Sequence, residues 1–135
     1  MRAQAIDLIT RYYAAFNAGD MERFLDLLTD DVVHDINQGL RQTGREAFAV
    51  FMQHMNRCYR ERLDDIVVMA NDAGDRAAAE FVVNGEYLRT DEGLPDAHGQ
   101  RYCLPAGAFF TLREGKVARV TNYYNLPDWI AQVGG

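Results

Sequence analysis

The chain has 135 residues, of which 48% are hydrophobic and 25% are charged, and its formal net charge is -6 at pH 7. This length and composition predict a single globular domain over residues 1–135, with a core large enough to need no disulfide or metal. The acidic balance and the absence of adjacent Lys or Arg residues argue against binding to nucleic acid or to an anionic membrane.

The cysteine pattern and the N-terminal sequence suggest where the protein is found. Cys58 and Cys103 are the two cysteines, and they do not form a C-x-x-C pair. The first residues, MRAQAIDLITRYY, lack the continuous apolar segment of a signal peptide. No apolar run approaches the roughly 18 residues of a membrane-spanning helix. We therefore expect a cytoplasmic protein with two free thiols.

The N-terminal half has the periodicity of helices. Apolar residues at spacings of three and four predict a helix over residues 3–17, which Gly19 ends. Asp20 can cap a second, short helix. The sequence TGRE at 43–46 predicts a capping box, and the helix that it starts is expected to run to about residue 60.

The C-terminal half alternates with period two. It predicts strands at 66–70 and 76–88, joined by the turn NDAGD, and a final hairpin of strands 101–112 and 116–126. The polar segment 90–99 is interpreted either as a flap over a cavity or as a simple connection. Helices followed by antiparallel strands predict an α+β domain, a curved sheet with helices on one face.

Two segments resemble a known family. RYYAAFNAGDMERFLDLLTDDVVHD and FFTLREGKVARVTNYY are similar to the opening and closing parts of the nuclear-transport-factor-2-like superfamily, in its ketosteroid isomerase and SnoaL-like polyketide cyclase branches. The resemblance implies a cone-shaped fold, in which three N-terminal helices and a strongly curved, mostly antiparallel sheet enclose an apolar cavity. It also implies a homodimer through the outer sheet face. It does not fix the function, because this fold serves enzymes, adaptors and binding modules alike.

The isomerase site carries over only in part. That enzyme uses a carboxylate base on its first strand, with a tyrosine and a protonated aspartic acid as donors to the oxyanion. Tyr12 matches the tyrosine, whereas the base position falls on Ile36 and the second donor position on Ala108. Asp35 precedes the base position by one residue and points to the other face unless the strand bulges. Steroid isomerisation by that mechanism is therefore not expected.

The same alignment predicts which side chains enter the cavity. If Ile36 points inward, His34 on the stretch DDVVHDINQG (30–39) does so as well. The other strands then contribute inward positions at Ala78, Glu80, Val82 and Asn84, at Leu104, Ala106, Ala108 and Phe110, and at Val120, Asn122 and Tyr124. An apolar wall with a few converging polar groups is typical of a small-molecule site.

These positions suggest proton transfer without a cofactor. A carboxylate such as Glu80 can orient the His34 ring and raise its basicity, so that the pair removes a proton next to a carbonyl. Asp35 is a further catalytic candidate. The groups that can contact the ligand or its enolate are Tyr12, Asn37, Asn84, Asn122 and Tyr124. The expected ligand is small, largely apolar and carbonyl-containing, and the reaction an isomerisation, cyclisation or elimination.

Several alternatives stay open. Periodicity alone favours a strand 76–88 whose core face is formed by Ala77, Ala79, Phe81, Val83 and Tyr87, which leaves Glu80 and Asn84 in water. His34 can also be a core histidine, and Asp35 and Asn37 can simply cap the turn at Gly39. The protein can then be a non-catalytic dimeric binding protein with the same cavity, or a protein adaptor.

Metal binding is not expected from the sequence. His34, His54 and His98 show no H-x-x-x-H spacing, and His54 lies on a helix with no second ligand recognised at a suitable offset. Nucleotide-binding motifs and the G-x-S-x-G motif of serine hydrolases are absent from the sequence. We therefore expect neither a metal nor an organic cofactor.

Overall fold

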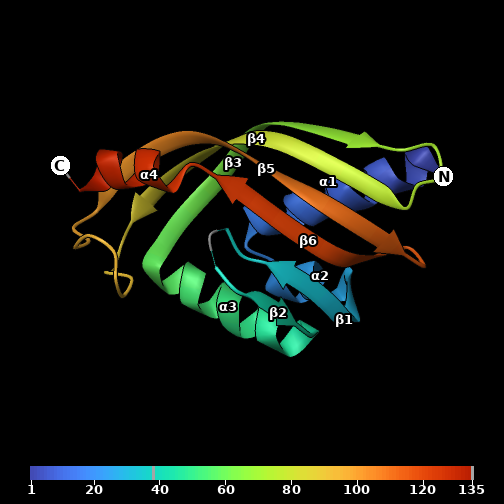
Figure 1. Cartoon of the computed structure of the whole chain (residues 1–135), viewed down its shortest axis with the longest axis horizontal. Helices are drawn as coiled ribbons and strands as arrows, with labels where there is room; N and C mark the ends of the chain where they lie inside the picture. The colour runs from blue at the N-terminus through green and yellow to red at the C-terminus, as the bar shows by residue number, and fades with distance from the viewer. Residues whose placement is uncertain (38, 135) are drawn as a thin grey trace.

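The computed structural model describes residues 1–37 and 39–134. Within these residues the chain forms four helices and six strands. Figure 1 labels them along the chain. In chain order they are α1 (Arg2–Ala18), α2 (Met21–Asp26), β1 (Leu28–Asp35), β2 (Arg41–Thr43), α3 (Arg45–Cys58), β3 (Tyr59–Ala70), β4 (Arg76–Tyr87), β5 (Gln100–Arg113), β6 (Lys116–Tyr124) and α4 (Leu126–Val133).

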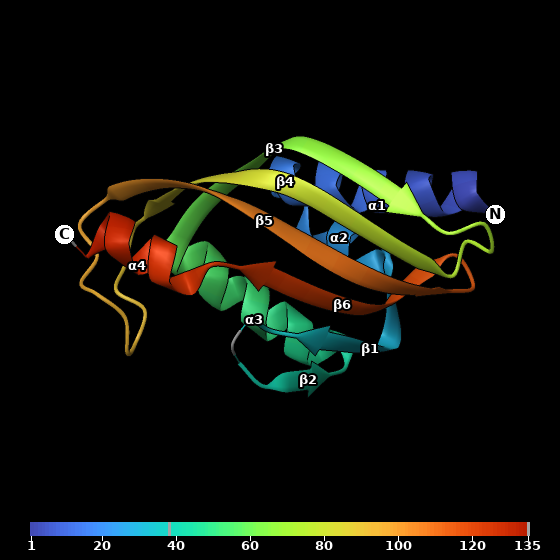
Figure 2. The same ribbon diagram turned by 45° about the horizontal axis from the view of Figure 1, so that its top comes forward.

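The strands form one curved sheet in the order β2-β1-β6-β5-β4-β3. All neighbours are antiparallel except β1 and β6, which are parallel. The long strands β3 to β6 arch over the helices α1, α2 and α3, which lie on the concave side, as Figures 1 and 2 show. The predicted α+β fold is confirmed, with a fourth helix, α4, added at the C-terminus. In the described part of the chain, no helix combines the length and apolarity that crossing a membrane requires.

The residues that end the first helix and begin the second do so as predicted. Gly19 ends α1 in the left-handed conformation, with a φ of 69°, where a residue with a Cβ is strained. The side chain of Asp20 then accepts a hydrogen bond from the backbone N–H of Arg23 at 3.1 Å, which caps α2. The two helices are therefore separated by a tight corner that the sequence specifies.

The start of α3 differs from the prediction. Gly44, not Thr43, is the N-cap residue, and no side chain caps the helix. Thr43 belongs to the short strand β2 and pairs with Val33 of β1, and the N–H of Gly44 donates to the carbonyl of Val32 at 2.8 Å. The predicted capping box is wrong because strand pairing fixes Thr43 in an extended conformation.

Three parts of the fold were missed, namely the short strand β2, the first half of β3 and the helix α4. β3 begins directly after α3, at Tyr59, and a bulge between Asp64 and Val67 divides it into a charged half and the predicted apolar half. The helix α4 begins at the cap residue Asn125, whose side chain accepts from the N–H of Asp128 at 3.1 Å. It packs against β5.

Candidate active site

The concave face of the sheet and the helices enclose a cavity of about 690 Å³. Its wall is largely aromatic and aliphatic, and Trp129 of α4 is part of it at the C-terminal end. The predicted wall on β5 is confirmed in part: Leu104 and Ala106 line the cavity, whereas Ala108 and Phe110 are buried in the core and are not among the lining residues. The size and lining are those of a site for a small, mostly apolar ligand.

His34 points toward this cavity as predicted. Its side chain is 2% exposed, and its ring stacks on Phe48 with centroids 4.1 Å apart. The Nδ2 atom of Asn122 lies 3.3 Å from His34 Nε2, whereas His34 Nδ1 has no hydrogen-bond partner among the described residues. Burial lowers the pKa of His34 to about 4, against the opposing effect of Asp35. The ring is therefore neutral at pH 7 and a weak base.

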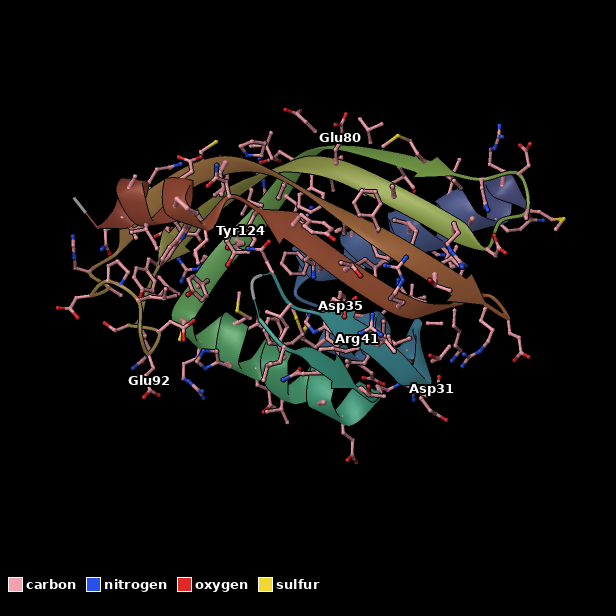
Figure 3. The ribbon with its side chains drawn as sticks, viewed as in Figure 1. Asp31, Asp35, Arg41, Glu80, Glu92 and Tyr124 are labelled. Carbon is pink, nitrogen blue, oxygen red and sulfur yellow. The ribbon has the colours of Figure 1, made fainter. Side chains whose placement is uncertain are left out.

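Asp35 does not belong to the cavity. Figure 3 shows it beside Arg41, whose Nε donates to Asp35 Oδ1 at 2.6 Å, and the hydroxyl of Thr121 donates to Oδ2 at 2.6 Å. The hydrogen bond from Arg41 is the main reason that the pKa of Asp35 is lowered to about 2. Asp35 thus ties β1 to its neighbours β2 and β6, and it is not among the residues that line the cavity, where its predicted catalytic role would require it.

Glu80 and Asn84 lie on the outer face of the sheet, so their predicted place in the cavity is wrong. On β4 the buried residues are Ala77, Ala79, Phe81, Val83 and Tyr87, as the competing periodicity interpretation proposed. Figure 3 shows Glu80 pointing away from the helices. Asn84 donates to Asp64 Oδ2 at 2.7 Å on the same outer face. A shift of one residue in the alignment reverses every side chain of a strand, which explains the error.

The remaining predicted ligand contacts line the cavity, namely Tyr12, Asn37, Asn122 and Tyr124. Tyr12 sits among aromatic rings, 4.6 Å from the centroid of Phe24, and burial raises the pKa of its hydroxyl. Asn37 Oδ1 accepts from the backbone N–H of Tyr124 at 3.0 Å, which joins the end of β1 to β6. The strand parity predicted for β1 and β6 is therefore correct.

A carboxyl group that the sequence interpretation missed faces the same cavity. Glu61 of β3 lines it, and the hydroxyl of Tyr102 on β5 donates to Glu61 Oε2 at 2.5 Å. Burial raises the pKa of Glu61, and the hydrogen bond from Tyr102 partly opposes this rise. Burial is the main cause of the raised pKa of Tyr124, and the charge of Glu61 adds to it. Glu61 holds its proton to higher pH than an ordinary glutamate.

The sequence contains little that predicts a buried position for Glu61. It lies in RERLDD, which reads as a charged surface segment, and its β4 partner is Gly85. A Cβ atom added at Gly85 would lie 2.3 Å from Tyr102 Cζ, so a glycine is needed for the Tyr102 ring to occupy this place. The glycine inside a predicted strand is the one signal for a close approach at this point.

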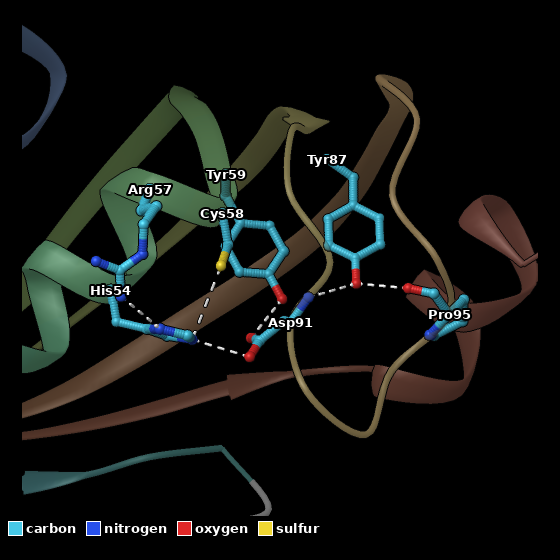
Figure 4. Close-up of polar contacts among 7 residues, drawn as sticks. All are labelled: His54, Arg57, Cys58, Tyr59, Tyr87, Asp91 and Pro95. Atoms are coloured by element: carbon cyan, nitrogen blue, oxygen red, sulfur yellow. Dashed lines mark hydrogen bonds and ion pairs between the residues drawn. The ribbon is translucent and has the colours of Figure 1, made fainter.

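A second polar cluster lies at the rim of the cavity, where α3 ends and the loop after β4 begins. His54 Nε2 lies 2.8 Å from Asp91 Oδ1 and 3.9 Å from Cys58 Sγ. Figure 4 shows how the three side chains face one another. The hydroxyl of Tyr59 donates to Asp91 Oδ2 at 2.8 Å. The prediction that His54 has no companion at a suitable offset is wrong, because Cys58 follows one helical turn later and Asp91 arrives from the loop.

The loop 88–99 is held in place by Tyr87. Its hydroxyl donates to the carbonyl of Pro95 at 2.6 Å and accepts from the N–H of Asp91 at 2.9 Å. Asp91 and Leu94 of this loop line the cavity. The segment is therefore more than a solvated connection, since it forms part of the cavity wall.

Comparison with known proteins agrees with this architecture. Residues 9–120 match the family described as SnoaL-like domain. A candidate polyketide cyclase from Pseudomonas putida KT2440 is 68% identical over 96% of this chain and 97% of its own, with a TM-score of 0.95. A candidate polyketide cyclase from Xanthomonas campestris pv. campestris is 60% identical over 97% of both chains, with a TM-score of 0.94.

More distant structures share the fold alone. An LEH-like epoxide hydrolase from Mycobacterium tuberculosis is 16% identical over 98% of this chain and 90% of its own, with a TM-score of 0.78. No curated protein sequence matches the chain significantly. The family match over most of the chain and the near-identical folds of the two bacterial relatives decide the assignment: the chain belongs to the SnoaL-like domain family.

Proposed function

We propose that the protein is a cofactor-independent enzyme of the isomerase, lyase or cyclase type, and that Glu61 removes a proton next to a carbonyl of a ligand in the cavity. The observation that carries this proposal is a carboxyl group that lines an apolar cavity and whose pKa is raised by burial. A general base works best when its pKa lies near the working pH, and burial moves a glutamate in that direction.

Glu61 takes the role that His34 and Glu80 were expected to share. Glu80 is on the outer face, and burial lowers the pKa of His34 to about 4 despite the opposing charge of Asp35, so His34 is a weak base. Tyr102 orients the Glu61 carboxyl through the 2.5 Å hydrogen bond. The hydroxyl of Tyr124, which lines the same cavity, can then donate to the enolate oxygen as negative charge develops.

The ligand class follows from the wall of the cavity. Aromatic and aliphatic side chains from the helices and the sheet make up most of it, and polar groups such as Asn37, Asn122 and Tyr124 are interspersed among them. A cavity of about 690 Å³ accommodates a ligand with two or more fused rings. The relatives described as candidate polyketide cyclases support a carbonyl-rich, polyketide-like ligand for this chain as well.

The proposal is tested by hydrogen–deuterium exchange, which detects proton abstraction whatever the product. The protein is incubated in D₂O with a panel of ring-fused enolisable ketones, and deuterium next to the carbonyl is measured by mass spectrometry. We expect Glu61→Gln to slow the exchange by about 100-fold or more, the usual contribution of a general base. Glu80→Gln, the matched change on the outer face, should exchange like the wild type.

Two results would contradict the proposal. If Glu61→Gln exchanges as fast as the wild type, Glu61 is not the base. If the wild type binds members of the panel, detected by quenching of the Trp129 fluorescence in the cavity wall, and exchanges none of them, the protein is a non-catalytic binding protein.

A further inference from the structure

We propose that His54, Cys58 and Asp91 form a zinc-binding site at the rim of the cavity, and that the bound ion fastens the loop 88–99 to the end of α3. One ligand atom from each residue lies within 4.8 Å of the other two. The three atoms are an imidazole nitrogen, a thiol sulfur and a carboxylate oxygen, and all three are ordinary ligands of zinc.

Secondary structure brings the three residues together. His54 and Cys58 lie four residues apart on the last turn of α3, so their side chains are on the same face of the helix. Asp91 is placed beside them by three hydrogen bonds. The N–H groups of Leu88 and Arg89 donate to the carbonyl of Cys58 at 2.8 and 3.2 Å, and the N–H of Asp91 donates to the hydroxyl of Tyr87.

The contacts differ from those of a Cys-His-Asp relay. In such a relay the aspartate orients one ring nitrogen while the other nitrogen faces the nucleophile. Here the same atom, His54 Nε2, faces both Asp91 Oδ1 at 2.8 Å and Cys58 Sγ at 3.9 Å, as Figure 4 shows. Three ligand atoms that converge on one point suit a shared cation, because a metal ion needs its ligands around a common centre.

The surroundings of the three ligand residues also favour a metal site. The hydroxyl of Tyr59 donates to Asp91 Oδ2 at 2.8 Å, so Oδ1 is the oxygen left for the metal. A hydrogen bond of this kind to a metal ligand commonly raises metal affinity. Cys58 is 3% exposed, and its thiolate and the Asp91 carboxylate together balance the charge of a divalent ion. Three protein ligands leave one position of a tetrahedral zinc for water.

Two positively charged groups oppose the ion, since Arg57 and Arg89 both act on Cys58, and Arg57 also contacts His54. The Arg57 guanidinium lies 3.4 Å from His54 Nδ1, and since arginine can only donate, Nδ1 accepts and Nε2 carries the proton. Zinc binding at Nε2 moves this proton to Nδ1 and releases Arg57. The arginine is exposed and the contact is long, so little is lost when it moves away.

The site is tested with Zn²⁺ alone, added to the metal-free full-length protein in a calorimeter. We expect one ion per chain. His54→Gln, Cys58→Ser and Asp91→Asn should each weaken binding by about 100-fold or more, and Tyr59→Phe by about 10-fold. Arg57→Gln should bind more tightly than the wild type. The matched controls are Cys103→Ser and His98→Gln, an exposed cysteine and an exposed histidine outside the cluster, which should leave the affinity unchanged.

Two further measurements separate binding from misfolding and from the proposed reaction. Co²⁺ should give the absorption of a thiolate–cobalt bond in the wild type and not in Cys58→Ser, and circular dichroism checks that each variant is folded. Zn²⁺ should raise the thermal midpoint of the wild type, because an ion that binds only the folded state stabilises it. Binding that survives Cys58→Ser and Asp91→Asn, or that is lost with Cys103→Ser, would overturn the proposal. None of these readouts depends on Glu61 or on turnover.

Discussion

Removing a single hydroxyl group tests the contact on which the proposed base depends. Tyr102 is 4% exposed, and its hydroxyl donates to Glu61 Oε2 at 2.5 Å. Its ring also packs edge-on against Trp129, with centroids 5.8 Å apart. Tyr102→Phe keeps the ring and its packing and removes only the hydrogen bond, which leaves the Glu61 carboxyl without this donor.

The size of the effect follows from the charge of Glu61. A hydrogen bond to a charged group contributes about 1.5–3 kcal/mol, and one between neutral groups about 1 kcal/mol. Tyr102 lowers the pKa of Glu61, so it favours the ionised carboxylate. Tyr102→Phe should therefore cost about 1 kcal/mol at pH values below the raised pKa of Glu61, where the carboxyl is protonated, and about 1.5–3 kcal/mol above that pKa, where it is ionised.

The free energy of unfolding of the wild type should also depend on pH through Glu61. Burial raises the pKa of folded Glu61 above its unfolded value, so the folded state binds more protons between the two pKa values. The stability contributed by the protonated form is complete below the unfolded pKa and is lost as the pH rises through the folded pKa. Tyr102→Phe raises the folded pKa further and should steepen the loss.

The assay is urea unfolding, followed by circular dichroism, at several pH values between 4 and 8. Tyr123→Phe is the matched control, because Tyr123 is 56% exposed on the outer face. In a Glu61→Gln background, Tyr102→Phe should cost the same at every pH. If Tyr102→Phe stays within about 0.5 kcal/mol of the control at all pH values, Glu61 is solvated and the argument for it as a base fails.

Three further predictions concern other parts of the molecule. Burial lowers the pKa of His34 to about 4, so the wild type should lose at most about 3 kcal/mol of stability as the pH falls from about 6.5 to about 4. In parallel urea unfolding, His34→Phe should not show this loss. Gly85→Ala should cost about 1–3 kcal/mol in the same assay, because its Cβ meets the Tyr102 ring at 2.3 Å; a neutral result would mean that the ring moves freely. We also propose that the outer face joins two copies of the chain, since Met69 and Phe109 are 47% and 51% exposed there. The double variant Met69→Asp/Phe109→Asp should then have half the wild-type mass in sedimentation, and a monomeric wild type would contradict the proposal.

The sequence predicted those parts of the fold that local chemistry determines. At the corner between α1 and α2, the side chain of Asp20 accepts from a nearby backbone N–H, and in the turn after β3 the side chain of Asn71 does the same. The start of β3 and the helix α4 were missed for a different reason. Residues 59–65 carry charges that hide the alternation of the strand, and α4 is short and stabilised by packing against β5.

The candidate site shows the same division. His34, Asn122 and Tyr124 line the cavity as predicted. On β4 the periodicity of the side chains was right and the alignment was wrong by one residue, so Glu80 was assigned to the wrong face. Glu61 was missed because its burial depends on the pairing of β3 with β4 and on the Tyr102 ring.

The cluster at the rim could not be assembled from the sequence for a similar reason. His54 and Cys58 are separated from Asp91 by the whole of β3 and β4. Their proximity depends on the length of these two strands and on the hydrogen bonds that hold the loop. Long-range pairing of this kind leaves no local pattern in the residues themselves.

The central claim is that the carboxyl group of Glu61 is an acid–base group inside the cavity. The most direct measurement is a ¹³C NMR titration of the side-chain carboxyl groups, in which the Glu61 signal is assigned by its absence from Glu61→Gln. We predict a midpoint above the ordinary glutamate value of about 4.3, and a further rise in Tyr102→Phe. A midpoint at or below the ordinary value, unchanged in Tyr102→Phe, would show a solvated carboxylate and contradict the proposed function.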